Sequence, residues 1–206
     1  MSNKAHLLYA FYMSIRTIKT LCLFCGSSDG YSKSYKDGAL NLAKTMIERN
    51  ISLVYGGGGK GLMGTVSKAV YGKVPNVIGI IPEKLYESVR YLDHYEDDLV
   101  IVKDMHERKA EMYARSDAFV AMPGGVGTIE EFMEAYTWLH LGYHNKPIGL
   151  INIDGYFDHL LLFLNHCVDQ GFLREEFFKA LCVAPDSDRL LDMLEHVSLA
   201  LPSKFH

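Results

Sequence analysis

One glycine-rich segment combines a loop suited to binding an anion with two acids. Residues Pro123 to Glu131 have the sequence P-G-G-V-G-T-I-E-E. Backbone N–H groups at such a helix start bind phosphate, and a nearby carboxylate can stabilise a developing positive charge. The segment predicts an anion site beside a reactive or sugar-binding acid. The simpler alternative is that Thr128 and Glu131 only form a capping box at the start of a helix.

The two acids of this segment are expected to point in different directions. Successive residues of an α-helix turn by about 100°, so Glu130 and Glu131 cannot both face one ligand in the same way. This geometry argues against a two-carboxylate glycosidase built from the pair alone. The same helix is expected to carry an apolar stripe made of Ile129, Phe132, Met133, Tyr136 and His140.

A second segment places two adjacent cations at a predicted helix start. It has the sequence M-H-E-R-K from Met105 to Lys109. Basic residues in a first turn are mildly unfavourable against the helix dipole, so a bound anion explains Arg108 and Lys109 better than helix stability does. The alternative is a solvated helix face.

The stretch from Gly56 to Gly64 contains G-x-G-x-x-G twice, between a predicted strand and a predicted helix. Glycines there allow positive φ and close backbone approach to phosphate. With Glu83 as a ribose-binding acid, the motif also suits a dinucleotide, but it follows the second strand rather than the first. Lys60 is not in a G-K-[ST] context, which excludes a Walker A loop. A tight turn without a ligand is the remaining alternative.

Short apolar runs alternate with longer amphipathic stretches from Thr20 onward, which predicts a doubly wound, Rossmann-like α/β fold. About seven mainly parallel strands are expected, with helices on both faces. The predicted strands are Leu21–Cys25, Ser52–Tyr55, Val77–Ile81, Leu99–Val102, Ala118–Met122, Pro147–Ile153 and Leu181–Val183. The predicted helices are Ser34–Arg49, Leu62–Tyr71, His106–Ala114, Thr128–Leu141, Phe157–Gln170 and Ser187–Val197.

Ligands of such sheets bind beyond the carboxyl ends of the strands. Four segments with polar or glycine residues follow predicted strands, so one site is expected where they converge. These segments are Cys25 to Ser28, the Gly56 cluster, Met105-His106 and Pro123 to Gly125. We expect a single domain over residues 17–206, preceded by an extension, residues 1–16, outside the core.

Composition excludes several classes of protein. The chain of 206 residues has 21 Lys and Arg against 25 Asp and Glu, a net charge of −4, which does not suit binding to nucleic acid. The apolar run Leu7 to Met13 is too short for a membrane span and makes a poor signal peptide. Histidines lack metal-binding spacing, so no metal is expected.

The four cysteines predict a cytoplasmic protein, because they are too few and scattered for a disulfide framework. Cys22 and Cys25 form a C-x-x-C motif, but their odd spacing in a strand sends the side chains to opposite faces. A redox or metal role for this pair is therefore disfavoured.

Together these motifs resemble the LOG family of cytokinin riboside 5′-monophosphate phosphoribohydrolases, also labelled possible lysine decarboxylases. The resemblance covers Thr20 to Val197 and rests on P-G-G-x-G-T-x-x-E and M-H-x-R-K in the same order. Supporting stretches are Gly26 to Ser28, Tyr55 to Gly58, Gly61 to Gly64 and Trp138 to Gly142.

The resemblance implies roles for individual residues. Glu131 and Arg108 would be catalytic, and Gly125, Gly127 and Thr128 would hold the 5′-phosphate. Further nucleotide-binding positions would be Ser27, Gly57, Lys109, Gly124, Val126, Ile129, Glu130 and Thr137. The family usually supplies a ligand-facing Glu after its third strand, where this chain has Ser88-Val89, with Glu87 as a neighbouring substitute.

The implied reaction is hydrolysis of a purine riboside 5′-monophosphate to free base and ribose 5-phosphate. The base, adenine or an N6-modified adenine, is left open. No cofactor is required, and a homodimer is expected because the helix from Thr128 to Tyr143 carries more apolar surface than one sheet contact needs. The alternatives are a non-catalytic carrier of a nucleotide or of molybdenum cofactor, and a nicotinamide enzyme. A decarboxylase lacks support, because no Schiff-base lysine with a pyridoxal phosphate site is identifiable.

Overall fold

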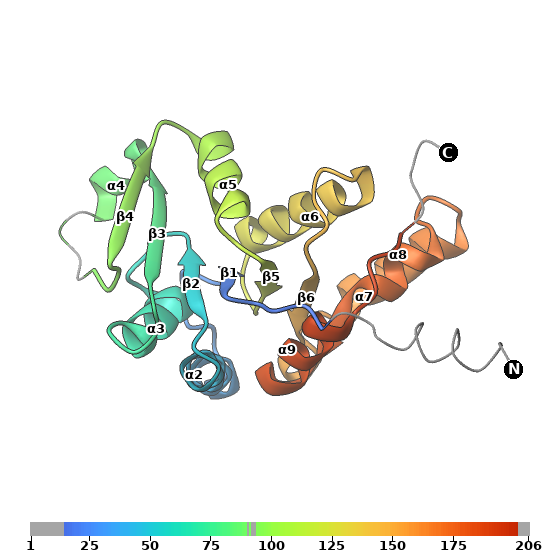
Figure 1. Ribbon diagram of the computed structural model, residues 1–206, viewed down its shortest axis with the longest axis horizontal. Coiled ribbons are helices and arrows are strands. Elements are labelled where there is room, and N and C mark those ends of the chain that lie inside the picture. Colours follow the sequence, from blue (N-terminus) through green and yellow to red (C-terminus); the bar gives the residue numbers. More distant parts are fainter. Residues whose placement is uncertain (1–14, 90, 92–93, 202–206) are drawn as a thin grey trace, which may run out of the picture.

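The computed structural model describes residues 15–89, 91 and 94–201, and its sheet is parallel and seven-stranded (Figure 1). The strand order is β4-β3-β2-β1-β5-β6-β7, so the chain winds outward from β1 in one direction and then returns to wind in the other. This confirms the predicted doubly wound fold. The strands are β1 (Thr20–Phe24), β2 (Ser52–Tyr55), β3 (Val77–Pro82), β4 (Asp98–Val102), β5 (Ala118–Ala121), β6 (Ile148–Ile151) and β7 (Cys182–Ala184).

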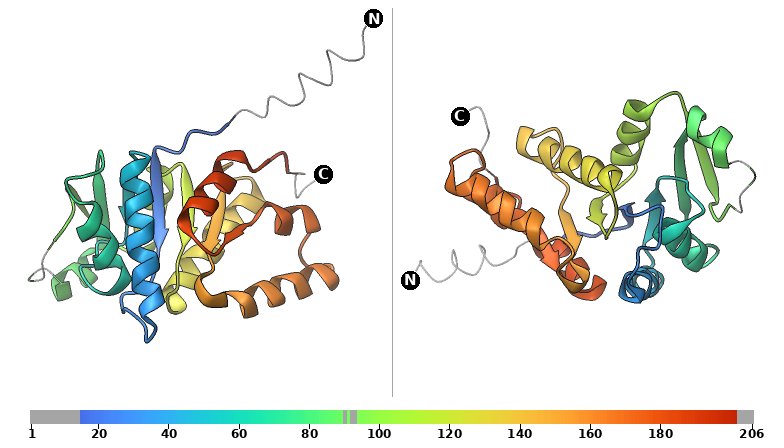
Figure 2. Two further views of the ribbon diagram at one scale, coloured as in Figure 1. Left: turned by 90° about the horizontal axis from the view of Figure 1, so that it is seen from below. Right: turned by 180° about the vertical axis from the view of Figure 1, so that it is seen from behind.

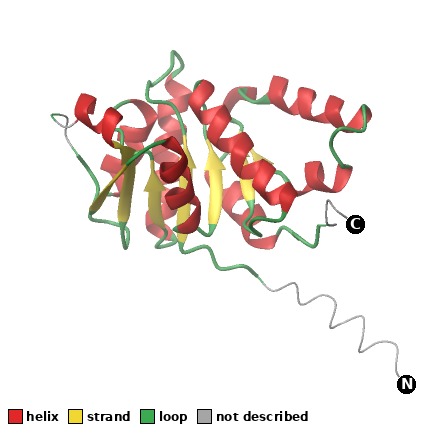
Figure 3. Ribbon diagram, turned by 90° about the horizontal axis from the view of Figure 1, so that it is seen from above, coloured by secondary structure: helices red, strands yellow, loops and turns green. Residues whose placement is uncertain are grey.

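Helices cover both faces of the sheet, as the turned views show (Figures 2 and 3). Helices α2, α3 and α9 pack against one face, and α5 and α6 pack against the other (Figure 1). The helices are α2 (Lys33–Glu48), α3 (Gly61–Val70), α4 (Glu83–Val89), α5 (Met105–Ala114), α6 (Val126–Leu141), α7 (Asp158–Asp169), α8 (Glu175–Ala180) and α9 (Ser187–His196), with a 3-10 turn at Ile153–Gly155.

Strand β1 shows how the sequence divides its side chains between the two faces. Leu21 and Leu23 belong to the core beneath α2 and α3, whereas Cys22 and Phe24 belong to the core beneath α5 and α6. Cys25 continues the first set. The prediction that Cys22 and Cys25 face opposite ways is therefore confirmed, as the period of two along a strand requires.

Side-chain caps fix the starts of three helices. Ser32 accepts a hydrogen bond from the Ser34 N–H before α2, and Asp186 accepts one from the Arg189 N–H before α9. Asp104 accepts from the N–H groups of His106 and Glu107 at 2.9 and 3.0 Å, which fixes the start of α5. These contacts satisfy backbone donors that a helix leaves unpaired at its first turn.

Short elements are where sequence reasoning was incomplete. Helix α4, helix α8 and the 3-10 turn were not predicted, and each spans seven residues or fewer. Two turns of helix carry too few positions to establish a period of 3.6 residues. The predicted strand Pro147–Ile153 was too long, because its last residues begin the 3-10 turn instead.

The start of the chain is described only from Ile15. Residues 1–14 of the predicted extension, including Leu7 to Met13, lie outside the described residues. The Arg16 N–H donates to the Glu195 carbonyl at 3.0 Å, so this end of the described chain is joined to α9. In the described part of the chain, no helix is long and apolar enough to cross a membrane.

Candidate active site

A cleft of about 550 Å³ opens at the carboxyl edge of the sheet, between α4, α5 and α6. All four segments expected to converge contribute to it, because each follows a strand that ends at this edge. The lining residues are Cys25, Gly26, Ser27, Gly56, Gly58, Met63, Ile81, Leu85, Ser88, Met105, Arg108, Gly125, Val126, Gly127, Thr128, Glu130 and Glu131.

Helix α6 begins earlier than the sequence pattern predicted. Its N-cap is Gly125 in an extended conformation, and no side chain caps it. Thr128 is therefore the third helical residue and cannot be the N-cap, so the capping box of Thr128 and Glu131 was wrong. The N–H groups of the first turn have no partner inside the helix and lie at the cleft, which is an arrangement that binds anions.

The glycines of this loop fall into two classes. A Cβ added at Gly124 would collide with the Thr128 hydroxyl and would lie 2.8 Å from the Gly26 nitrogen, so this glycine is required for packing. A Cβ at Gly125 or Gly127 would meet nothing within 4 Å. Packing within this chain therefore does not explain the last two glycines, whereas close approach of a ligand to their N–H groups would.

Arg108 and Glu131 form a buried ion pair at the base of the cleft. The Arg108 Nη1 donates to Glu131 Oε1 at 2.5 Å, and its Nε donates to the Ile80 carbonyl at 3.0 Å. The side chains are 9% and 11% exposed. A Cβ at Gly56 would collide with Arg108 Nη2, so glycine at that position gives the guanidinium its place. A solvated helix face is excluded for Arg108.

Burial raises the pKa of Glu131 above its ordinary value, although the charge and hydrogen bond of Arg108 act in the opposite direction. The acid is thus placed where its charged form is costly. Burial, and then the charge of Glu131, also raise the pKa of the Cys25 thiol in the same cleft. Cys25 therefore stays protonated and does not supply a thiolate nucleophile.

Lys109 lies behind the cleft, between α5 and α6. Its Nζ contacts Glu130 Oε1 and lies 3.1 Å from Glu134 Oε2, and its side chain is 7% exposed. Tyr113 donates to the same Glu134 carboxylate at 2.8 Å. The sequence suggested that Lys109 faces the ligand or solvent, but its burial beneath two acids of α6 places it outside the set of cleft-lining residues.

The remaining predicted residues divide between the cleft and its surroundings. Ser27 and Val126 line the cleft, while Ile129 packs on the core beneath α6. Gly57 has a φ of 68° and packs against a residue that lines the cleft, because a Cβ there would lie 3.2 Å from Ile81. Thr137 is exposed further along α6 and donates to the Met133 carbonyl at 2.7 Å, outside the cleft of this chain.

Helix α4 closes one side of the cleft with Leu85 and Ser88. Glu87, which the sequence offered as a substitute for the family's ligand-facing Glu, lies on the same helix but does not line the cleft. Ser88 lines it instead. Sequence reasoning also missed the apolar wall, because apolar residues carry the same signal whether they fill a core or line a cleft. That wall consists of Met63, Ile81, Leu85 and Met105.

The rim of the cleft exposes apolar side chains. Leu85 is 48% exposed, Met105 40% and Val126 87%.

Within residues 15–89, 91 and 94–201, no group of three His, Cys, Asp or Glu side chains could hold a metal ion. The cleft therefore combines an anion-binding helix start, one buried ion pair and an apolar wall.

Known proteins resemble this chain in sequence and in fold. A family model described as "Possible lysine decarboxylase" matches residues 63–194. The chain is 48% identical over 177 residues to a rice (Oryza sativa subsp. japonica) protein named "Probable cytokinin riboside 5'-monophosphate phosphoribohydrolase LOGL3", with 86% of this chain and 83% of that protein covered. It is 46% identical over 177 residues to "Cytokinin riboside 5'-monophosphate phosphoribohydrolase LOG2" of Arabidopsis thaliana, with the same coverage, 86% and 83%.

Among solved structures, a molybdenum cofactor binding protein from Rippkaea orientalis superposes with a TM-score of 0.63. The match covers 87% of this chain and 96% of that one, at 18% sequence identity. At this identity the likeness demonstrates a common fold and carries no information about the ligand.

Proposed function

Since this chain belongs to the LOG family, whose model is described as possible lysine decarboxylase, we propose that it hydrolyses a purine riboside 5′-monophosphate. The products are the free base and ribose 5-phosphate. The observation that carries the proposal is the Arg108–Glu131 ion pair beside an uncapped helix start in one cleft. Anion binding and glycosidic chemistry require such groups close together.

The 5′-phosphate binds at the start of α6. The N–H groups of Val126, Gly127 and Thr128 are free of helical partners, and the helix dipole favours a negative charge at this end. The open space at Gly125 and Gly127 admits the phosphate oxygens to the backbone. Phosphate binding there fixes the ribose over the ion pair.

Glu131 and Arg108 act on the ribose. The bond between C1′ and the base nitrogen breaks while water adds to C1′, and the base leaves with a proton. The ribose carries positive charge in the transition state, which an anionic Glu131 stabilises at close range. Arg108 holds this carboxylate in place through its hydrogen bond, and its positive charge offsets the repulsion between the carboxylate and the phosphate.

The base lies against the apolar wall formed by Met63, Ile81, Leu85 and Met105. Ser88 supplies a hydroxyl at the α4 side, where Glu87 does not line the cleft. A wall of this kind suits the flat face of a purine and also an apolar substituent on it. The choice between adenine and an N6-modified adenine is a question for the assay.

The test is release of free base and ribose 5-phosphate from AMP and from isopentenyl-AMP by the purified protein. We expect both products in equal amounts from at least one of these substrates, and no release from the matching riboside without phosphate. A protein that binds the nucleotide tightly without turnover would overturn the proposal in favour of a carrier. Turnover that depends on an added hydride acceptor would instead identify a nicotinamide enzyme.

We also propose that the protein is a cytoplasmic homodimer. Its four cysteines are all free, which suits a reducing compartment. Helix α6 buries Phe132, Tyr136 and Leu139 in the core, yet Val126 near its start and Tyr143 just after its end remain 87% and 74% exposed. A second copy would cover them. A monomeric mass by light scattering at working concentration would contradict the dimer.

A further inference from the structure

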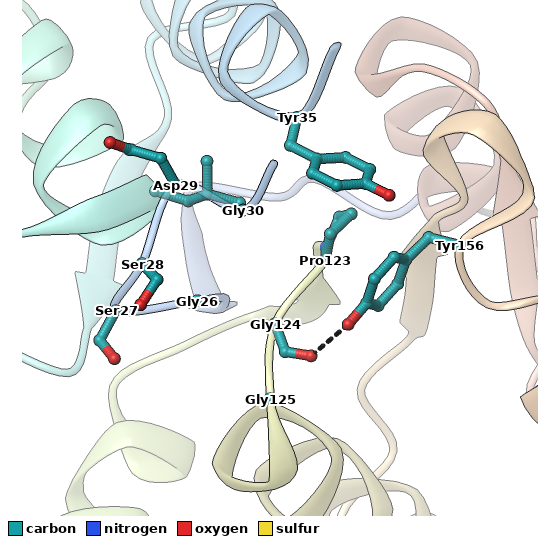
Figure 4. Close-up of a pocket in the computed structure, with 11 residues that line it drawn as sticks. Gly26, Ser27, Ser28, Asp29, Gly30, Tyr35, Pro123, Gly124, Gly125 and Tyr156 are labelled. Atoms are coloured by element: carbon teal, nitrogen blue, oxygen red, sulfur yellow. Dashed lines mark hydrogen bonds between the residues drawn. The ribbon is translucent and has the colours of Figure 1, made fainter. Parts of the chain in front are cut away.

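A second pocket, of about 300 Å³, lies behind the loop that opens α6 (Figure 4). It shares Gly26, Ser27 and Gly125 with the cleft, so this loop and the segment after β1 lie between the two spaces. Two tyrosines form its outer wall, Tyr35 from α2 and Tyr156 from the segment after β6 (Figure 4). Side chains in this pocket therefore contact the loop before α6 from the side opposite the cleft.

Tyr156 makes a direct hydrogen bond to the loop. Its hydroxyl donates to the Gly124 carbonyl at 2.6 Å, the dashed line in Figure 4. Its ring is held edge-on between Tyr35 at 5.5 Å and Phe157 at 5.0 Å, measured between ring centroids. Phe157 is 1% exposed, so the hydroxyl is carried by a ring that is packed against the core.

This hydrogen bond determines which way one peptide group faces. The peptide between Gly124 and Gly125 is trans and planar, like all those described, so its carbonyl and its N–H point in opposite directions. When the carbonyl faces Tyr156, the Gly125 N–H faces away from the second pocket, on the side where Gly125 lines the cleft. Adjacent glycines restrict the rotation of this peptide less than other residues would, so the hydrogen bond from Tyr156 adds a restraint.

We propose that Tyr156 is a positioning residue for the phosphate site. It acts through Gly124 and keeps the N–H at the start of α6 directed at the phosphate, without touching the ligand itself. This inference rests on the phosphate site of the proposed function. It concerns binding of the phosphate group, so it can be tested separately from hydrolysis.

The test compares Tyr156→Phe with Tyr35→Phe. Each variant removes one hydroxyl from the same pocket, but among the described residues only that of Tyr156 bonds to the loop. Titration with ribose 5-phosphate should show a threefold to fivefold loss of affinity for Tyr156→Phe, about the value of one hydrogen bond. Tyr35→Phe should bind ribose 5-phosphate like the parent, and both variants should bind adenosine, which lacks phosphate, like the parent.

If the parent protein hydrolyses a nucleotide, its KM and kcat provide a second test. Tyr156→Phe should raise KM for the 5′-monophosphate by the same factor and leave kcat within about twofold, since Glu131 and Arg108 are untouched. Equal affinity of the two variants for ribose 5-phosphate would overturn the inference, as would a kcat loss without a KM change. A parent that binds ribose 5-phosphate but hydrolyses nothing would contradict the proposed function while leaving the role of Tyr156 intact.

Discussion

Arg108 and Lys109 are neighbours on α5, and both pair with acids of α6, yet the two ion pairs differ in what they face. Arg108 and Glu131 line the cleft, whereas Lys109 lies behind it, beneath Glu130 and Glu134. One residue along a helix turns the side chain by about 100°. That single step separates a cation that lines the cleft from one that lies buried between two helices.

The acids of the two pairs also differ in environment. The Glu131 side chain is 11% exposed, and burial raises its pKa. The Glu130 side chain is 49% exposed, so water stabilises its charge. A carboxylate held partly desolvated beside a reacting sugar interacts strongly with positive charge there, because little water screens it. The comparison therefore supports the proposed catalytic role of Glu131 and a structural role for Lys109.

The largest expected effect is that of Glu131→Gln. The amide oxygen can still accept from Arg108, but it has no charge to stabilise the ribose in the transition state. We expect kcat for nucleotide hydrolysis to fall by at least about 100-fold. The free energy of unfolding should change by no more than about 1 kcal/mol, because the cost of burying the charge offsets the stronger hydrogen bond that a charged acceptor makes to Arg108. Product release and thermal melting, measured on the same preparation, check both.

Near-parent base release by Glu131→Gln would show that the acid only joins α5 to α6. The structure has already removed the other explanation, since Glu131 takes no part in capping. A loss of activity accompanied by unfolding would not count as support, so the melting curve is the necessary control.

The sequence was sufficient for the sheet and for the position of the cleft. Apolar runs such as Ser52–Tyr55 were predicted with their observed bounds, because strands buried on both faces show an unbroken apolar signal. Strand ends converge by topology alone, which is why the segments after β1, β2 and β5 could be placed in one cleft.

The sequence could not supply the contacts between helices. Thr128-x-x-Glu131 has the spacing of a capping box, but glycines at 125 and 127 allow the helix to start earlier, and no residue type distinguishes the two starts. The burial of Lys109 depends on where α5 meets α6 in space. Such pairings join residues about twenty positions apart and leave no periodic trace in the chain.

The second effect is a dependence of activity on pH. Because hydrolysis needs the ionised carboxylate, kcat/KM should fall about tenfold for each pH unit below the pKa of Glu131. Burial raises that pKa, so the fall should begin above the ordinary value for Glu, about 4.3. Rates measured from pH 4 to 8 test this expectation. The residual activity of Glu131→Gln should not show this fall in kcat/KM at low pH.

The pH dependence of the free energy of unfolding is an independent check, because the raised pKa of Glu131 fixes its direction. A carboxyl whose pKa is raised by folding stabilises the protein while it is protonated, and that contribution is lost as pH rises through the raised pKa. The unfolding free energy of the parent should therefore decrease relative to that of Glu131→Gln from about pH 4.3 upward. An increase over this range would mean that Arg108 outweighs burial and lowers the pKa.

A smaller effect is expected for Glu130→Gln, the matched control for Glu131. Glu130 lines the cleft near its opening and contacts Lys109. The amide oxygen of Gln still accepts a hydrogen bond, so loss of the charge at this cleft-lining position should raise KM by no more than about tenfold. The value of kcat should stay within about threefold of the parent, because the Glu130 side chain points in a different direction from that of Glu131. A kcat loss equal to that of Glu131→Gln would abolish the distinction between the two acids.

The smallest effect on activity, and the sharpest test of the comparison, is that of Lys109→Met. Burial lowers the pKa of Lys109, but Glu130 and Glu134 outweigh it and raise the pKa above its ordinary value, so the ammonium is firmly charged in the folded protein. Removing it leaves two acids of α6 facing each other without a cation. The free energy of unfolding should fall by about 1–3 kcal/mol, since both carboxylates keep partial access to water.

Activity should respond much less to Lys109→Met, because methionine fills the same space and Arg108 and Glu131 keep their contact. We expect KM and kcat to stay within about threefold of the parent at a temperature where both proteins are folded. The opposite pattern, a KM raised at least tenfold with an unchanged melting temperature, would mean that Lys109 binds the nucleotide directly. The two cations of α5 would then serve the same ligand, and the division between a reactive and a structural ion pair would be wrong.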